Sequence, residues 1–124
     1  MKFTVFAALV AIALPAPALA AEWVLVEANI SGDRFYIDLQ SIRTMPNGYK
    51  RMWIRNDFAK PDKDGETSLK YYREYDCIEK RNRFLSIRAF SGEQVTSTSS
   101  AVSEWEYVSP DSVQEGLFMF VCRK

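Results

Sequence analysis

The sequence contains no histidine among its 124 residues. This absence excludes Ser-His-Asp and Cys-His catalytic arrangements, histidine general bases and the commonest zinc ligand. No other combination of nucleophile and base stands out along the chain. We therefore expect a non-catalytic protein with no metal site and no cofactor.

An excess of one charge sign is also absent, since 16 Lys and Arg residues balance 16 Asp and Glu residues. Proteins that bind nucleic acid usually carry a positive field, so the net charge gives no reason to expect a nucleic-acid partner. Glycine and proline are sparse, with five of each, which argues against a disordered, collagenous or low-complexity chain. The length suits one domain with a hydrophobic core.

Long apolar runs are missing except at the start of the chain. Lys2 precedes an apolar stretch over 3–14, two prolines follow, and Ala18-Leu19-Ala20 forms a small-residue cleavage site. This pattern predicts a secretory signal peptide at residues 1–20 and a mature domain at 21–124. An uncleaved membrane anchor is the alternative, but the stretch is short for one. No cysteine follows it, so we expect a periplasmic or secreted protein with no lipid anchor and no membrane span.

Cysteine occurs only twice, as Cys77 and Cys122. In an exported protein an even pair of cysteines predicts one disulfide, which here would close a loop of about 45 residues. The alternative is a reactive thiol, which needs a nearby base or a Cys-x-x-Cys pair, and neither is visible.

Most of the mature chain alternates between short aromatic or β-branched segments and turn signals such as Asn47-Gly48. The last segment differs, because Val113, Leu117, Phe120 and Val121 recur on one helical face, with Ser109 as the expected N-cap. The pattern predicts an α+β fold: a sheet of about six antiparallel strands with a C-terminal helix packed on it and tethered by one disulfide. The expected strands cover 22–29, 34–38, 49–59, 68–80, 83–90, 95–100 and 101–108, with a helical turn at 39–42.

Basic residues gather in one place, where aromatic side chains are interleaved with them: Lys80, Arg81, Arg83, Phe84 and Arg88. Such a cluster fits an acidic glycan, a single-stranded nucleic acid or an acidic protein patch. The alternative is a solvated hairpin tip with no binding role. Two further features have similar alternatives. Asp62, Asp64 and Glu66 fit a solvated loop better than a calcium site, and the Ser/Thr run 96–100 fits an exposed edge strand on which another chain can pair.

Several motifs together resemble the surface-adhesin protein E family of Gram-negative bacteria. They include Tyr75-Asp76-Cys77 on the long strand, then Trp105 with the run Val108-Ser109-Pro110-Asp111-Ser112, and the terminal Cys122. The resemblance covers the mature chain. It implies the same sheet, helix and disulfide, a homodimer, and binding of host extracellular-matrix or plasma proteins such as vitronectin, laminin and plasminogen, with the basic cluster as the contact surface.

A different role is compatible with the same fold. A periplasmic envelope-maintenance or small-ligand-binding protein would need a pocket between the sheet and the helix, near Val113, Leu117 and Phe120. The family's founding adhesin is a lipoprotein, whereas this sequence has no cysteine at its cleavage site.

Overall fold

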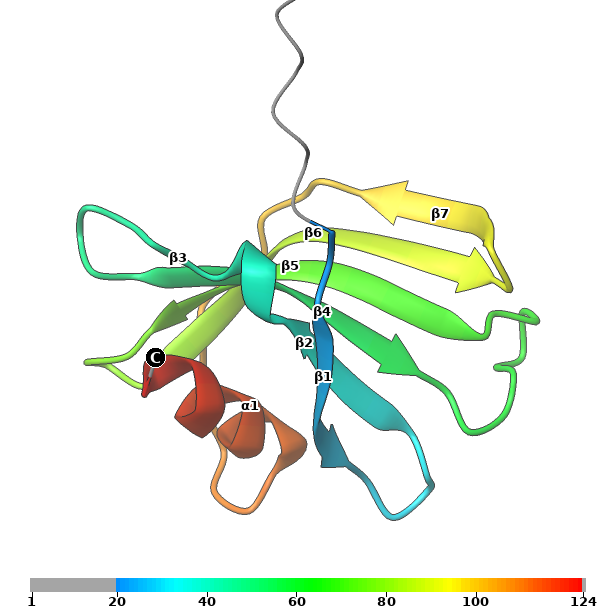
Figure 1. Ribbon diagram of the computed structural model, residues 1–124, viewed down its shortest axis with the longest axis horizontal. Helices are drawn as coiled ribbons and strands as arrows, with labels where there is room; N and C mark the ends of the chain where they lie inside the picture. Colours follow the sequence, from blue (N-terminus) through cyan, green and yellow to red (C-terminus); the bar gives the residue numbers. More distant parts are fainter. Residues whose placement is uncertain (1–19, 124) are drawn as a thin grey trace, which may run out of the picture.

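The computed structural model describes residues 20–123, so the expected signal peptide lies outside the described residues apart from Ala20. One antiparallel sheet with the path β1-β2-β4-β5-β6-β7 forms the body of the domain, and one helix packs against it (Figure 1). The strands of the sheet are β1 (Trp23–Ala28), β2 (Arg34–Asp38), β3 (Arg43–Thr44), β4 (Lys50–Asp57), β5 (Ser68–Asp76), β6 (Arg81–Ser91), β7 (Gln94–Ser99) and β8 (Glu106–Tyr107). The predicted fold class is confirmed.

The sheet has eight strands rather than about six, and two of them are short strands that pair at the side of the main path. β3 pairs with β4 and β8 pairs with β6, and each is only two residues long. The connection from β3 to β4 is the expected hairpin, in which Gly48 has φ 91°. That conformation is open to glycine and costly for most other residues, which explains the Asn-Gly pair at this point.

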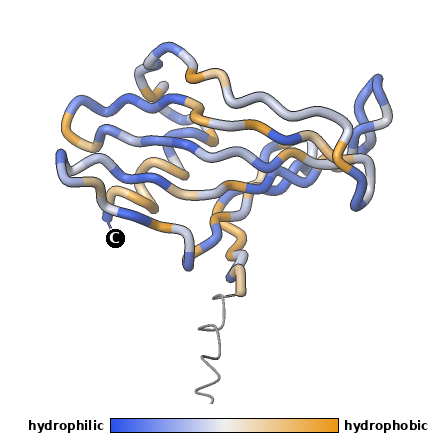
Figure 2. Tube along the Cα trace, turned by 90° about the horizontal axis from the view of Figure 1, so that it is seen from above, coloured by the Kyte–Doolittle hydropathy of each residue, from blue (hydrophilic) through white to orange (hydrophobic). Residues whose placement is uncertain are grey.

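Alternation along the central strands builds the core. Met52 and Ile54 of β4 are fully buried, and Tyr71 and Tyr75 of β5 are buried beside them. Hydrophobic and hydrophilic residues follow one another along the strands (Figure 2). The helix α1 (Val113–Cys122) covers this face with Leu117, Phe118 and Val121, all of which are buried.

The helix begins later than the sequence indicates. Its N-cap is Ser112, whose side chain accepts a hydrogen bond from the Glu115 amide at 3.1 Å, rather than Ser109. Asp111 has φ 56°, a left-handed conformation that a right-handed helix cannot include. The sequence shows two serines three residues apart, and only the backbone conformation between them decides which one caps the helix.

The expected disulfide is present and joins the end of β5 to the end of α1. Cys77 follows β5 and Cys122 is the last residue of α1, and the two sulfurs are bonded. The covalent link therefore holds the helix against the sheet at its C-terminal end.

The segment expected as a strand over 101–108 is mostly irregular. Only Glu106 and Tyr107 pair with β6, whereas residues 100–105, here called the strap, run alongside β6 without strand structure. Ser103 fixes the strap, because its amide donates to the Phe84 carbonyl at 3.0 Å and its hydroxyl accepts from the Phe84 amide at 2.8 Å. Within 20–123, no helix is long and apolar enough to cross a membrane.

Candidate functional site

The sheet has two unlike faces. One face packs against α1, and the opposite face, here called the open face, carries the side chains that alternate with the core residues. On the central strands these open-face side chains are mainly aromatic or charged. They are Arg51, Trp53, Arg55, Lys70, Tyr72, Glu74, Asp76, Arg81, Arg83, Arg88 and Phe90.

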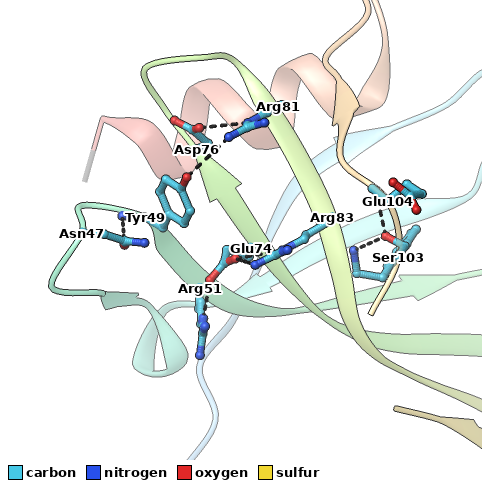
Figure 3. Close-up of polar contacts among 10 residues, drawn as sticks. Asn47, Tyr49, Arg51, Glu74, Asp76, Arg81, Arg83, Ser103 and Glu104 are labelled. Atoms are coloured by element: carbon cyan, nitrogen blue, oxygen red, sulfur yellow. Dashed lines mark hydrogen bonds and ion pairs between the residues drawn. The ribbon is translucent and has the colours of Figure 1, made fainter. Parts of the chain in front are cut away.

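A buried carboxylate organises one end of the open face. The side chain of Glu74 is only 2% exposed and accepts hydrogen bonds from Arg51 at 2.6 Å and Arg83 at 2.7 Å (Figure 3). These residues lie directly opposite one another on β4, β5 and β6. Two guanidinium groups thus compensate the charge of a desolvated carboxylate, which is the condition for burying it.

A second ion pair lies beside the first, nearer the turn between β5 and β6. Arg81 Nε lies 3.0 Å from the Asp76 carboxylate, and an Arg81 Nη lies 3.5 Å from the Tyr49 hydroxyl (Figure 3). Burial alone would raise the pKa of Asp76, but hydrogen bonds from the Glu79 amide and from Arg81 outweigh it, so the pKa lies below its ordinary value. The same pair raises the pKa of Arg81.

Trp105 of the strap covers these arginines. Its ring lies 4.5 Å from the Arg81 guanidinium carbon and 4.2 Å from that of Arg83, and it meets the Tyr49 ring edge-on at 5.4 Å. A tryptophan face attracts a cation that lies over it. The sequence gives Trp105 no such role, because the strap contacts are long-range and leave no local pattern.

The predicted basic cluster divides between different environments. Arg81, Arg83 and Arg88 lie on the open face. Lys80 is exposed in the tight turn at residues 77–80, a segment that the sequence predicts as the end of the strand over 68–80. Phe84 points to the opposite face, where its ring meets Tyr71 edge-on at 5.4 Å. The structure therefore brings the three arginines to one face and leaves Phe84 on the other.

The other end of the open face carries cations among aromatic rings. The Arg55 guanidinium lies 4.3 Å from the Tyr36 ring and 5.1 Å from the Trp23 ring. Lys70 lies 5.1 Å from the Phe90 ring and 5.8 Å from Trp23. These residues come from separate strands, so the sequence alone does not group them.

The helix-covered face contains a buried cation. Arg73 is 4% exposed, its Nε and Nη1 atoms have no hydrogen-bond partner, and its guanidinium lies 4.1 Å from the Phe84 ring. Tyr75 beside it is fully buried, and burial raises the pKa of its hydroxyl to about 12 against the opposing charge of Arg73. Burial likewise raises the pKa of Tyr71.

The other features singled out in the sequence have structural surroundings of their own. The Asp62 carboxylate accepts hydrogen bonds from the amides of Asp64 and Glu66, both at 2.9 Å, so it shapes the loop. Among residues 20–123, no group of three or more cysteine, aspartate or glutamate side chains is arranged to hold a metal ion. β7 is exposed along its whole length at the edge of the sheet, as expected for the Ser/Thr run.

A shallow groove of about 700 Å³ lies between residues 27–31 and the first turn of α1. Its acidic side chains are Glu27, Asp111 and Glu115. Near the middle of the helix, a hollow of only about 80 Å³ is lined by Val108, Phe118 and Met119 among others. Neither is the enclosed, mainly apolar cavity of a few hundred Å³ that is typical of small-molecule sites.

Comparison with known proteins agrees with this architecture. The crystal structure of Haemophilus influenzae protein E in crystal form II matches with a TM-score of 0.61 and 11% sequence identity, over 89% of this chain and 94% of that chain. At that identity the match shows a shared fold. A search of curated protein sequences finds no match. The family model for surface-adhesin protein E matches residues 23–123, so the chain belongs to the surface-adhesin protein E family.

Proposed function

We propose that this protein is a non-catalytic, exported protein of the adhesin type that binds a macromolecular partner through the open face of its sheet. The observation that carries the proposal is the composition of that face. Cationic and aromatic side chains outnumber the carboxylates on it, and apart from the strap no helix of the described residues covers its central strands as α1 does on the other side. Exposed surfaces of this composition are typical of binding sites.

The residues proposed for contact are those of the predicted cluster. Lys80 and Arg88 are exposed, and Arg81 and Arg83 present half-buried guanidinium groups beneath Trp105. Phe84 would act from the opposite face, by holding β6 in place through its packing on Tyr71. By the family relationship, the partner proposed is a host extracellular-matrix or plasma protein.

Binding to immobilised laminin, vitronectin and plasminogen tests the proposal. The double variant Lys80→Gln/Arg88→Gln should bind more weakly than the parent to whichever protein is recognised. Lys60→Gln/Lys63→Gln is the matched control, because it removes the same charge from the exposed loop between β4 and β5. Equal binding by both double variants, or no binding by the parent, would remove the proposal.

Location is a separate part of the proposal, in which residues 1–20 direct export to the periplasm or beyond it. Antibody labelling of intact cells, compared with release by osmotic shock, distinguishes the two. Surface labelling agrees with contact with a host. Release by shock alone would restrict the protein to the periplasm and contradict an adhesin role.

The family relationship also implies a homodimer, and we propose that its interface is the exposed edge of β7. The strand offers unpaired backbone groups to a second copy. Thr98→Pro would remove one backbone donor on this strand. A dimer that is seen by light scattering in the parent and persists unchanged in this variant would exclude pairing through β7.

The buried Arg73 favours a second candidate function, small-ligand binding between the sheet and the helix. A buried guanidinium whose Nε and Nη1 atoms have no hydrogen-bond partner is costly, and an anionic ligand would compensate it. Native mass spectrometry of the purified protein tests this candidate. A bound anion that is lost in Arg73→Met would support it, and a spectrum of the bare chain alone would contradict it.

A further inference from the structure

A row of like charges crosses the open face at the end away from Trp105. Arg55 of β4 lies directly opposite Lys70 of β5, which in turn lies directly opposite Arg88 of β6. Like charges in directly opposed positions destabilise a sheet. The arrangement therefore costs stability, and a bound anion would relieve that cost.

Compensation inside the described part of the chain is incomplete. Arg55 pairs with Asp57 at 3.0 Å, but neither Lys70 nor Arg88 forms an ion pair with any residue of 20–123. At the other end of the same face each arginine is paired, since Glu74 contacts both Arg51 and Arg83 and Asp76 contacts Arg81. An external anion would thus gain most at the row.

Aromatic rings border the row. Two residues from Arg55 and Lys70 on the same face, the rings of Trp53 and Tyr72 stack with their centroids 5.1 Å apart. Phe90 lies two residues beyond Arg88 on β6. The Trp23 ring of β1 lies 5.1 Å from the Arg55 guanidinium and 5.8 Å from the Lys70 ammonium group. Flat apolar rings interspersed with cations offer surface for stacking as well as charge.

We propose that this row and its bordering rings bind an acidic polysaccharide, a linear chain of sugars that carries sulfate or carboxylate groups. Neighbouring strands lie about 4.8 Å apart, so the cations form a line roughly 10 Å long that a repeating polyanion can follow. The C–H faces of the sugar rings would stack on Trp53, Tyr72 and Phe90. The inference rests on the proposed function for the choice of a cell-surface polymer over a nucleic acid, and it names a site that shares only Arg88 with the predicted cluster.

Heparin, polygalacturonate and uncharged dextran are the probes, each titrated into the purified protein while tryptophan fluorescence is recorded. We expect heparin and polygalacturonate to bind and dextran not to bind, and we expect the affinity to fall steeply with salt because counterions are released. Lys70→Gln/Arg88→Gln should weaken heparin binding about tenfold or more. Lys70→Arg/Arg88→Lys should retain it, and the loop control Lys60→Gln/Lys63→Gln should match the parent.

Several outcomes would overturn the inference. No heparin binding, equal binding by the row variant and the loop control, or equal affinity for a single-stranded oligonucleotide at the same salt concentration would each do so. The same variants tested on immobilised laminin keep the two proposals separate. If the parent binds the matrix protein but not the glycan, this inference alone is removed. If the parent binds neither, the proposed function is removed as well.

Discussion

Removing the disulfide is the sharpest test of how the helix is held. Cys77 and Cys122 close a loop across 45 residues, and the helix makes its remaining contacts mainly through Leu117, Phe118 and Val121. In the chain-entropy account, a cross-link of that length stabilises the folded state by about 4 kcal/mol. We expect Cys77→Ser/Cys122→Ser to lose roughly that amount, which lowers the Tm of a domain of this size by about 15–20 °C.

Urea denaturation followed by tryptophan fluorescence measures the loss, with the dithiothreitol-reduced parent as the matched control. Both should unfold at a much lower urea concentration than the oxidised parent. Hydrogen exchange should show that the α1 amides lose protection first, because the helix is the element released. If the double variant unfolds at the same urea concentration as the parent, the helix is held by packing alone and the account of the disulfide is refuted.

Three further predictions concern single side chains. Glu74→Ala should cost about 2–3 kcal/mol in urea denaturation, because it leaves two partly exposed guanidinium groups without their carboxylate, and Glu74→Gln should cost less. Gly116→Ala should stabilise the folded protein by about 1 kcal/mol only when it is combined with Glu27→Ala, because a methyl group at Gly116 would overlap the Glu27 carboxylate. An equal effect of Gly116→Ala with and without Glu27→Ala would contradict this. Asp76 has a pKa in the folded protein below its ordinary 3.8, so it stabilises the fold above that pH and this contribution is lost as the pH falls further. Asp76→Asn should therefore unfold with a shallower dependence on pH below about 4.

The strands and the core could be predicted from the sequence because their signals are local. Alternation over 68–80 places Tyr71, Arg73 and Tyr75 on one face, and the structure buries all three there. The Asn47-Gly48 pair predicts its hairpin for the same reason, since the backbone conformation depends on the residue itself. The disulfide follows from the cysteine count and the inferred export.

The start of the helix and the strap could not be predicted in this way. Ser109-Pro110-Asp111 has the residues of a helix start, but the left-handed conformation of Asp111 moves the cap to Ser112. The strap looks like a strand in sequence because it contains Val102 and Trp105. Its path is instead decided by long-range contacts with β6, through Ser103 and Trp105.

The candidate site could be predicted only in part. Phe84 is grouped with the arginines because it is next to them in the sequence. Consecutive side chains of a strand point to opposite faces, so Phe84 and Arg83 lie on different faces of β6. The row of Arg55, Lys70 and Arg88 is visible only after the strands are paired, since these residues are distant in sequence. Register is therefore the information that sequence patterns lacked.

Lysine footprinting tests most directly whether the open face is the binding surface. The purified protein is acetylated with and without laminin or heparin, and mass spectrometry quantifies each modified lysine. Our account predicts that bound partner protects Lys70 of the open face and leaves Lys60 and Lys63 of the exposed loop as reactive as before. Protection of the loop lysines with Lys70 unchanged would contradict it.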